Sequence, residues 1–298
     1  MRDKLKIAHI SDVHFSKICY SPFQFFSKRW LGNANLLLKR GRAHSVKKVT
    51  ILPEMFKKLG VTDLFITGDL TTTSQHSEFK LAKELITAFE EMGIRVLLIP
   101  GNHDNYTRFA EKQQRFFQHL SQTYPSKRHL DVTLKDDKVC AFKLENGWWV
   151  VALDTTLSLP LHLSGGRYTE AIDQTLRATL EKIPSDEPII LVNHFPFFQH
   201  EPSKRRMEGG ALLETLMRET PNIKFYLHGH THRRCMADLR SDNLPIVIDS
   251  GSVSHKTHGS WNLINLEPKS ASVSVYLSND TIDPNWRLSR TETFDFVV

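Results

Sequence analysis

Short apolar runs that end in polar turns constrain the fold of this 298-residue chain more than any other feature. Runs of strand length lie at residues 5–10, 63–67 and 95–99. Apolar residues with helical spacing follow them at residues 44–59, 78–92 and 106–120. Strand, loop and helix in alternation are typical of an α/β domain whose loops gather at one edge of a sheet. The polar loops after Ile10, Thr67 and Ile99 should therefore lie side by side.

The second half of the chain continues this pattern with more hairpins. We expect a hairpin at 139–144 and 148–153, helices at 169–183 and 210–219, strands at 188–192, 223–227 and 245–248, and a closing hairpin at 261–266 and 271–277. The sequence contains no internal repeat and no linker between two domains. We therefore predict a single domain, 1–298, with an insertion at 15–45.

Composition indicates an ordinary globular protein of a reducing compartment. Its three cysteines are odd in number and widely spaced, so a disulfide framework is not expected. The amino-terminal residues run directly into a strand, which leaves no room for a signal peptide, and no apolar run reaches membrane-spanning length. We expect a cytoplasmic protein whose oligomeric state the sequence leaves open.

The basic charge of the protein belongs to one segment, which includes the predicted insertion. Between Val13 and Pro53 there are eight Lys or Arg and no acid, so the remainder of a chain with net charge +6 has net charge −2 (6 − 8). Aromatic and aliphatic residues, among them Phe25, Phe26 and Trp30, alternate with these cations. One interpretation is a partly buried helical hairpin with solvated cations. The other is a surface element that lies in an anionic lipid interface.

Nine polar residues follow the expected strands, and they are all Asp, Asn or His. They are Asp12, His14, Asp69, Asn102, His103, Asp104, His194, His230 and His232. Such oxygen and nitrogen ligands suit Mn²⁺, Fe or Zn²⁺, and the absence of cysteine argues against a structural zinc site. Seven ligands exceed the needs of one ion, whereas two ions that share a carboxylate would use them all. Of the remaining two, His103 suits a proton donor and Asp104 a group that orients it.

This ordered set of motifs resembles the signature of the calcineurin-like metallophosphoesterase superfamily. The resemblance implies a four-layer α/β (α+β) sandwich of two packed mixed β-sheets flanked by helices. It also implies one metal held by Asp12, His14, Asp69 and His232, and a second held by Asp69, Asn102, His194 and His230. Asp69 would bridge two divalent ions, for which Mn²⁺ is our first expectation and Fe or Zn²⁺ the alternatives.

The insertion suggests the substrate. A lipid-compatible segment directly after His14 is similar to what is found in the UDP-2,3-diacylglucosamine diphosphatases of lipid A biosynthesis, in the branch that keeps Gly-Asn-His-Asp. That resemblance implies a nucleotide-linked acylated sugar substrate and a peripheral position on the cytoplasmic face of the inner membrane, with no nucleic-acid partner. A soluble cyclic-nucleotide phosphodiesterase and a metal-free interaction scaffold are the alternatives.

Further residues near the expected loops have open roles. His228 is expected to pack or to support the ligands, whereas Ser250 to Ser252 should lie near the site. Arg233, Arg234 and the run Lys204-Arg205-Arg206 either reach an anionic substrate or are solvated.

Overall fold

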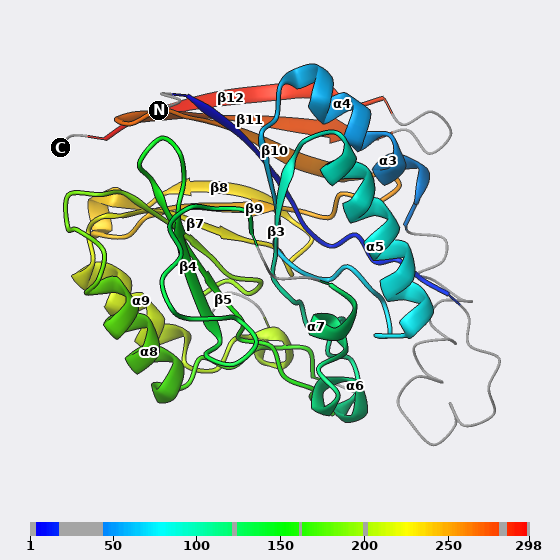
Figure 1. Ribbon diagram of the computed structural model, residues 1–298, viewed down its shortest axis with the longest axis horizontal. Helices are drawn as coiled ribbons and strands as arrows, with labels where there is room; N and C mark the ends of the chain where they lie inside the picture. Colours follow the sequence, from blue (N-terminus) through cyan, green and yellow to red (C-terminus); the bar gives the residue numbers. More distant parts are fainter. Residues whose placement is uncertain are drawn as a thin grey trace.

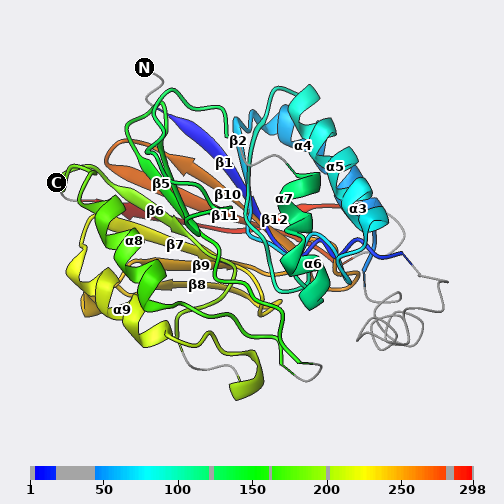
Figure 2. The ribbon, with the colours of Figure 1, turned by 60° about the horizontal axis from the view of Figure 1, so that its bottom comes forward.

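Two six-stranded β-sheets face each other, and helices cover their outer surfaces (Figure 1, Figure 2). The computed structural model describes residues 4–17, 44–120, 124–160, 163–198, 202–279 and 285–296. The expected arrangement of two packed mixed sheets flanked by helices is confirmed.

The first sheet has the strand order β12-β11-β10-β1-β2-β3. Its strands are β1 (Leu5–Ile10), β2 (Asp63–Ile66), β3 (Arg95–Leu98), β10 (Gly259–Leu266), β11 (Ser270–Ser278) and β12 (Arg287–Asp295). β1, β2 and β3 are parallel, and the pairs β1–β10, β10–β11 and β11–β12 are antiparallel. The carboxyl ends of β1, β2 and β3 therefore meet at one edge, where the three polar loops lie together.

The second sheet has the order β4-β5-β6-β7-β9-β8. Its strands are β4 (Val139–Lys143), β5 (Trp149–Leu153), β6 (Ile189–Val192), β7 (Ile223–His228), β8 (Arg234–Asp238) and β9 (Ile246–Ser250). The four central strands are parallel and the two edge strands are antiparallel to their neighbours.

Successive side chains of each strand pack on opposite faces of the sheet and so belong to two different hydrophobic cores. In β1, Ile7 packs between the sheets, whereas its neighbour Ala8 packs towards the helices on the outer face. Ile190 and Leu191 of β6 divide in the same way between the inter-sheet core and the core under the helices of the second sheet. Side chains that point alternately up and down need apolar cover on both faces, which explains the continuous apolar runs in the sequence.

Seven α-helices are described. They are α3 (Lys47–Thr50), α4 (Leu52–Leu59), α5 (His76–Glu91), α6 (Arg108–Lys112), α7 (Arg115–His119), α8 (Glu170–Leu180) and α9 (Gly210–Glu219). Short 3₁₀ turns lie at Ser203–Arg205 and Arg240–Asp242. In Figure 2, α4 and α5 lie on one side of the molecule with the first sheet, and α8 and α9 lie against the second. No helix among these is long and apolar enough to cross a membrane.

Two helices predicted as continuous are each broken in two. The segment 44–59 divides into α3 and α4 because Pro53 lies in the first turn of α4, where its missing N–H is tolerated. The segment 106–120 divides into α6 and α7 at Gln114, which has a left-handed backbone with φ of 49°.

Part of the predicted insertion lies outside the described residues, including Phe25, Phe26 and Trp30. Of the eight cations between Val13 and Pro53 the structure describes Lys17, which lies within 15–45, and Lys47 and Lys48, which follow it. Lys48 is buried, and its ammonium donates to the carbonyls of His255, Lys256 and Ser278 at 3.0, 2.5 and 2.6 Å. Counting Lys48 among the cations of a surface element was therefore wrong, because its charge is enclosed by carbonyl oxygens.

Candidate metal centre

The seven residues expected as ligands lie together at the carboxyl ends of strands from both sheets. Asp12 and His14 follow β1, Asp69 follows β2 and Asn102 follows β3, all in the first sheet. The second sheet contributes the other three ligands. His194 follows β6, and both His230 and His232 follow β7. The site thus spans the seam between the two sheets.

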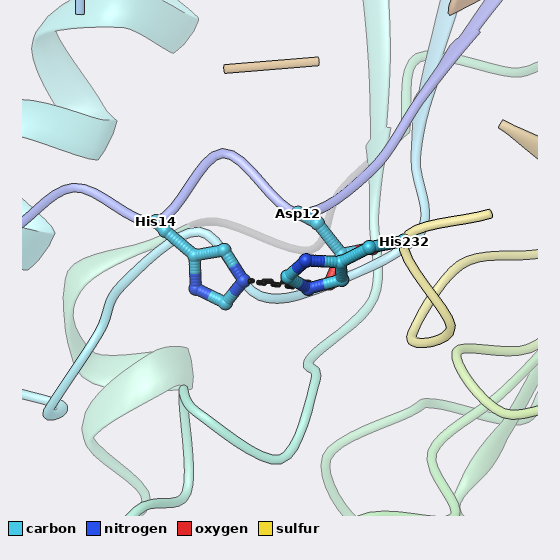
Figure 3. Close-up of side chains that lie close together, drawn as sticks. All are labelled: Asp12, His14 and His232. Atoms are coloured by element: carbon cyan, nitrogen blue, oxygen red, sulfur yellow. Dashed lines mark hydrogen bonds and ion pairs between the residues drawn. The ribbon is translucent and has the colours of Figure 1, made fainter. Parts of the chain in front are cut away.

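Asp12, His14 and His232 form the first group of ligand atoms (Figure 3). Asp12 Oδ1 lies 3.0 Å from His232 Nε2 and 3.5 Å from His14 Nε2, and the two nitrogens are 3.1 Å apart. Ligand atoms that sit about 2.1 Å from one ion lie roughly 3 to 3.5 Å from one another. Asp12 Oδ1 is also buried and makes no hydrogen bond to any described residue. These spacings fit a divalent ion.

Asn102, His194 and His230 form the second group. Asn102 Oδ1 lies 3.3 Å from His194 Nε2 and 3.0 Å from His230 Nδ1. Asp69 lies between the groups, because its Oδ2 is 3.6 Å from His194 Nε2 and 3.8 Å from His14 Nε2. One carboxylate therefore faces both groups, as a bridging ligand must.

The backbone is strained where it presents these ligands. Nine described residues other than glycine have positive φ, and five of them are expected ligands: Asp12, His14, Asp69, His230 and His232, with φ between 52° and 68°. A left-handed conformation costs an L-residue on the order of 1–2 kcal/mol. Strain concentrated at one edge of the sheets marks a functional site that the rest of the fold holds in place.

Two glycines permit the loops to approach one another. A Cβ on Gly101 would lie 2.2 Å from Asp69 Oδ1, and one on Gly229 would lie 1.9 Å from Ser11 Oγ and 2.7 Å from Asp12 Oδ2. Any side chain at either position would displace a carboxylate of the site.

Burial and mutual contact set the charge of the ligands. Burial alone would raise the pKa of the Asp12 carboxyl, but the imidazoles of His232 and His14 outweigh it and hold that pKa well below its usual range. Burial lowers the pKa of His194 and lowers that of His230 further. An ionised carboxylate and neutral imidazoles are the forms that bind metal ions.

Backbone carbonyls select the imidazole nitrogen that faces the site. His194 Nδ1 donates to Thr67 O at 2.6 Å, which leaves Nε2 towards Asp69 and Asn102. His230 Nε2 donates to Arg205 O at 3.1 Å, which leaves Nδ1 towards Asn102. Such carbonyl partners fix the tautomer and orientation of metal-binding histidines.

The structure differs from the expectation that Asp104 orients His103. His103 Nδ1 donates instead to the carbonyl of Thr72 at 2.7 Å. The Asp104 carboxylate accepts hydrogen bonds from the backbone N–H groups of Leu70, Thr71 and Gly101 at 3.2, 2.8 and 2.9 Å. Asp104 therefore ties the loop after β2 to the loop after β3, and a carbonyl orients His103. The ring of His103 lies 5.0 Å from that of His14 and stacks on Tyr106 at 5.5 Å.

A cavity of about 480 Å³ opens over the ligands. Its lining includes Arg205, one of the cations whose role the sequence left open. It also includes His44, Ser164 and His255, which sequence reasoning did not select as site residues. A single histidine in a loop carries no signal in a sequence, so His44 and His255 could not have been recognised.

The residues with open roles are now placed. Arg233 and Arg234 are exposed, and the described lining of the cavity does not include them. His228 is buried and donates from Nδ1 to Gly229 O at 2.9 Å, as a packed residue does. Ser252 donates to the carbonyl of Asp12 at 2.8 Å, so the turn after β9 supports the first ligand loop.

The fold and the ligand groups define a metal-dependent phosphoester hydrolase. Residues 5–234 match the model of the calcineurin-like phosphoesterase family, and the chain belongs to that family. The family and the ligand groups support a cofactor of two divalent metal ions.

Solved structures share this fold. A dimetal phosphatase from Danio rerio is 13% identical, with a TM-score of 0.63 over 98% of this chain and 99% of that one. Purple acid phosphatase PPD1 from yellow lupin (Lupinus luteus) is 10% identical, with a TM-score of 0.62 over 98% of this chain and 54% of that one. GAP50, described as the anchor in the inner membrane complex of Plasmodium, is 11% identical, with a TM-score of 0.53 over 100% and 90% of the two chains. No curated protein sequence matches the chain.

Proposed function

We propose that this phosphoesterase hydrolyses the pyrophosphate of UDP-2,3-diacylglucosamine, releasing UMP and the acylated sugar phosphate in lipid A biosynthesis. Water adds to one phosphorus, the bond from that phosphorus to the bridging oxygen breaks, and the departing phosphate oxygen receives a proton. We further propose that the protein works as a peripheral protein on the cytoplasmic face of the inner membrane.

The observation that carries this proposal is the place where the aromatic and basic segment joins the site. The segment is preceded by Phe15, which directly follows His14 and pairs with Thr71 in the loop after β2. It is followed by His44, whose ring lies 4.8 Å from that of His14. The described residues on either side of a segment rich in Phe, Trp, Leu, Lys and Arg thus lie beside the metal centre. Apolar and cationic side chains together suit a substrate with acyl chains in an anionic membrane.

The ligand roles follow the two groups of atoms. Asp12, His14, Asp69 and His232 would hold one ion, and Asp69, Asn102, His194 and His230 the other, with Mn²⁺ proposed for both. When bound, two divalent ions supply positive charge to the phosphoryl oxygens and acidify the attacking water.

His103 would donate a proton to the oxygen of the leaving group. Because its Nδ1 donates to Thr72 O, its Nε2 is the nitrogen left to exchange a proton. The carbonyl keeps the ring oriented, and stacking on Tyr106 limits its rotation.

Two measurements test the substrate. The Mn²⁺-loaded protein should hydrolyse UDP-2,3-diacylglucosamine with a kcat/KM far above that for cyclic AMP. A preference for cyclic AMP would support a cyclic-nucleotide phosphodiesterase and remove the lipid proposal.

A triple substitution of Phe25, Phe26 and Trp30 by Ser should lower kcat/KM on the acylated substrate much more than on bis(4-nitrophenyl) phosphate. Leu288→Ser on the edge strand β12, where the side chain is 56% exposed, is the matched control and should change neither value. Equal losses on both substrates would assign the segment to the core. Failure of the protein to sediment with anionic liposomes at low salt would count against the membrane proposal.

A further inference from the structure

The cavity over the metal centre is suited to an anion. Its described lining combines the guanidinium of Arg205 with hydroxyl, amide and imidazole groups. Among the described residues of this lining, the single carboxylate is that of Asp69, which faces both ligand groups. The cavity walls beyond the ligands therefore offer donors and positive charge to whatever lies next to the reacting phosphorus.

His255 is fixed as a hydrogen-bond donor. Its Nδ1 accepts the backbone N–H groups of Thr257 and His258 at 3.3 and 3.1 Å. A nitrogen that accepts two N–H groups carries no proton, so the proton of this imidazole is on Nε2. His255 lines the cavity, and its backbone is held by a bridge to His44 and by Lys48, which donates to its carbonyl at 3.0 Å.

Arg205 approaches the cavity from the second sheet. Its Nη2 donates to His230 O at 2.7 Å, while its own carbonyl accepts from His230 Nε2 at 3.1 Å. This reciprocal pair places a guanidinium, a planar group with five N–H donors suited to phosphate oxygens, beside the second ligand group.

We propose that Arg205 and His255 form a subsite for a second phosphoryl group, bonded through oxygen to the phosphorus that is attacked. The proposal rests on the proposed function and deepens it: the protein selects phosphoanhydrides over simple diesters because the neighbouring phosphate binds outside the metal centre.

Competition with a small diester substrate tests the subsite directly. Hydrolysis of bis(4-nitrophenyl) phosphate by Mn²⁺-loaded protein is inhibited with methylenediphosphonate or with inorganic phosphate, with Mn²⁺ in excess over the inhibitor. Each of these residues would donate a hydrogen bond to a charged phosphonate. His255→Ala and Arg205→Ala should therefore each raise the inhibition constant of methylenediphosphonate by about 10- to 100-fold. Inhibition by inorganic phosphate should weaken by much less, so the ratio of the two inhibition constants changes.

Two further variants separate binding from structure. His258→Gln is the matched control, because its ring stacks on His255 at 5.2 Å but is exposed and its backbone N–H is retained. It should leave both inhibition constants unchanged. Arg205→Lys keeps the charge without the planar fork and should give an intermediate loss. Bound metal is measured in every variant.

The outcomes distinguish the two proposals. An unchanged ratio of inhibition constants in His255→Ala and Arg205→Ala would overturn the subsite, whatever the lipid substrate does. Equal weakening of both inhibitors together with loss of metal would also overturn it, since the residues would then support the metal centre alone. If the ratio changes but UDP-2,3-diacylglucosamine is not hydrolysed, the subsite stands and the proposed lipid substrate falls.

Discussion

The backbone N–H of His230 donates to Asp12 Oδ2 at 3.0 Å, across 218 positions of the sequence. Asp12 follows β1, one of the two central strands of the first sheet, and His230 follows β7 of the second. The same two residues would hold different metal ions, so the contact joins both ligand groups and both sheets. Metal binding and the packing of the sheets should therefore be coupled.

Removal of metal should destabilise the protein. A ligand at about 100 times its Kd stabilises the folded state by about 2.7 kcal/mol for each site, and here each ion would join loops from both sheets. Urea unfolding with Mn²⁺ and with a chelator measures the difference. In Asp69→Ala, which removes the carboxylate facing both groups, the difference should be much smaller and activity should be lost. Equal stability with and without metal in the unsubstituted protein would contradict the coupling.

His103→Asn should keep both metals and lose rate. The side chain of His103 contributes to neither ligand group as proposed, so metal content should remain at two ions while kcat falls by ~10²–10⁴, the usual contribution of a positioned acid. Metal analysis and steady-state kinetics on the same preparation decide between the roles. Loss of metal as severe as in Asp69→Ala would make His103 a ligand.

Asp104→Asn should act through the loops. Its carboxylate accepts three backbone N–H groups, and an amide can present an oxygen to part of that set while its NH₂ group opposes the rest. The free energy of unfolding should fall by about 1–3 kcal/mol. The shape of the pH–rate profile should stay the same, because the Thr72 carbonyl orients His103. If the pH–rate profile of Asp104→Asn lost its acidic or basic limb, Asp104 would have to take part in proton transfer.

Gly229→Ala should abolish metal binding by steric displacement. The added Cβ would lie 1.9 Å from Ser11 Oγ and 2.7 Å from Asp12 Oδ2, so the ligand loop after β1 must move. Gly147→Ala is the control: its φ of +97° is unfavourable for alanine, at a cost of about 1–2 kcal/mol, but nothing lies within 4 Å of its Cβ. This control should lose stability and keep its metal. A metal-replete Gly229→Ala protein would show that the loops have room to separate.

The metal-free protein should lose stability as the pH falls below about 6.5. Burial, with a smaller contribution from His228, lowers the pKa of His9 to about 3, whereas in the unfolded chain it is near 6.5. Because the pKa is lower in the folded state, this contribution is fully present above pH 6.5 and is lost as the pH falls towards 3. The slope is about 1.4 kcal/mol per pH unit for one proton. Urea unfolding at several pH values should show a shallower slope in His9→Gln, and an unchanged slope would exclude His9 as its source.

Much of the fold was predictable because buried strands and helices have clear apolar periodicity. The parallel strands β1, β2 and β3 lie close to their expected bounds, and the hairpins β4–β5 and β10–β11 form as expected. The strands β8 and β12 were missed. Both lie at sheet edges and are largely exposed, so their sequences, which begin Arg234-Cys235 and Arg287-Leu288, lack the apolar alternation of a covered strand.

At the site, the metal-ligand residues that follow strands could be recognised from the sequence, but the groups that hydrogen-bond to the site residues could not. Asp12, Asp69 and Asn102 come directly after apolar runs, so their convergence follows from the parallel sheet. The orientation of His103 by Thr72 depends on a carbonyl, which every residue has and no sequence pattern marks. His44 and His255 approach the cavity through loop packing that the sequence does not encode locally.

Because the ligands are divided between two stacked sheets, the geometry of the metal centre depends on how the two sheets are aligned. A sideways shift of one layer by a fraction of an ångström would change the distances between Asp12 and His232 directly, although no ligand had been altered. Selection for metal affinity thus extends to apolar side chains such as Ile7 and Ile190, which fill the space between the layers and touch no substrate. Loops around the cavity that carry no ligand, such as the one that holds His255, have no such constraint, and substrate preference can diverge there while the alignment is preserved.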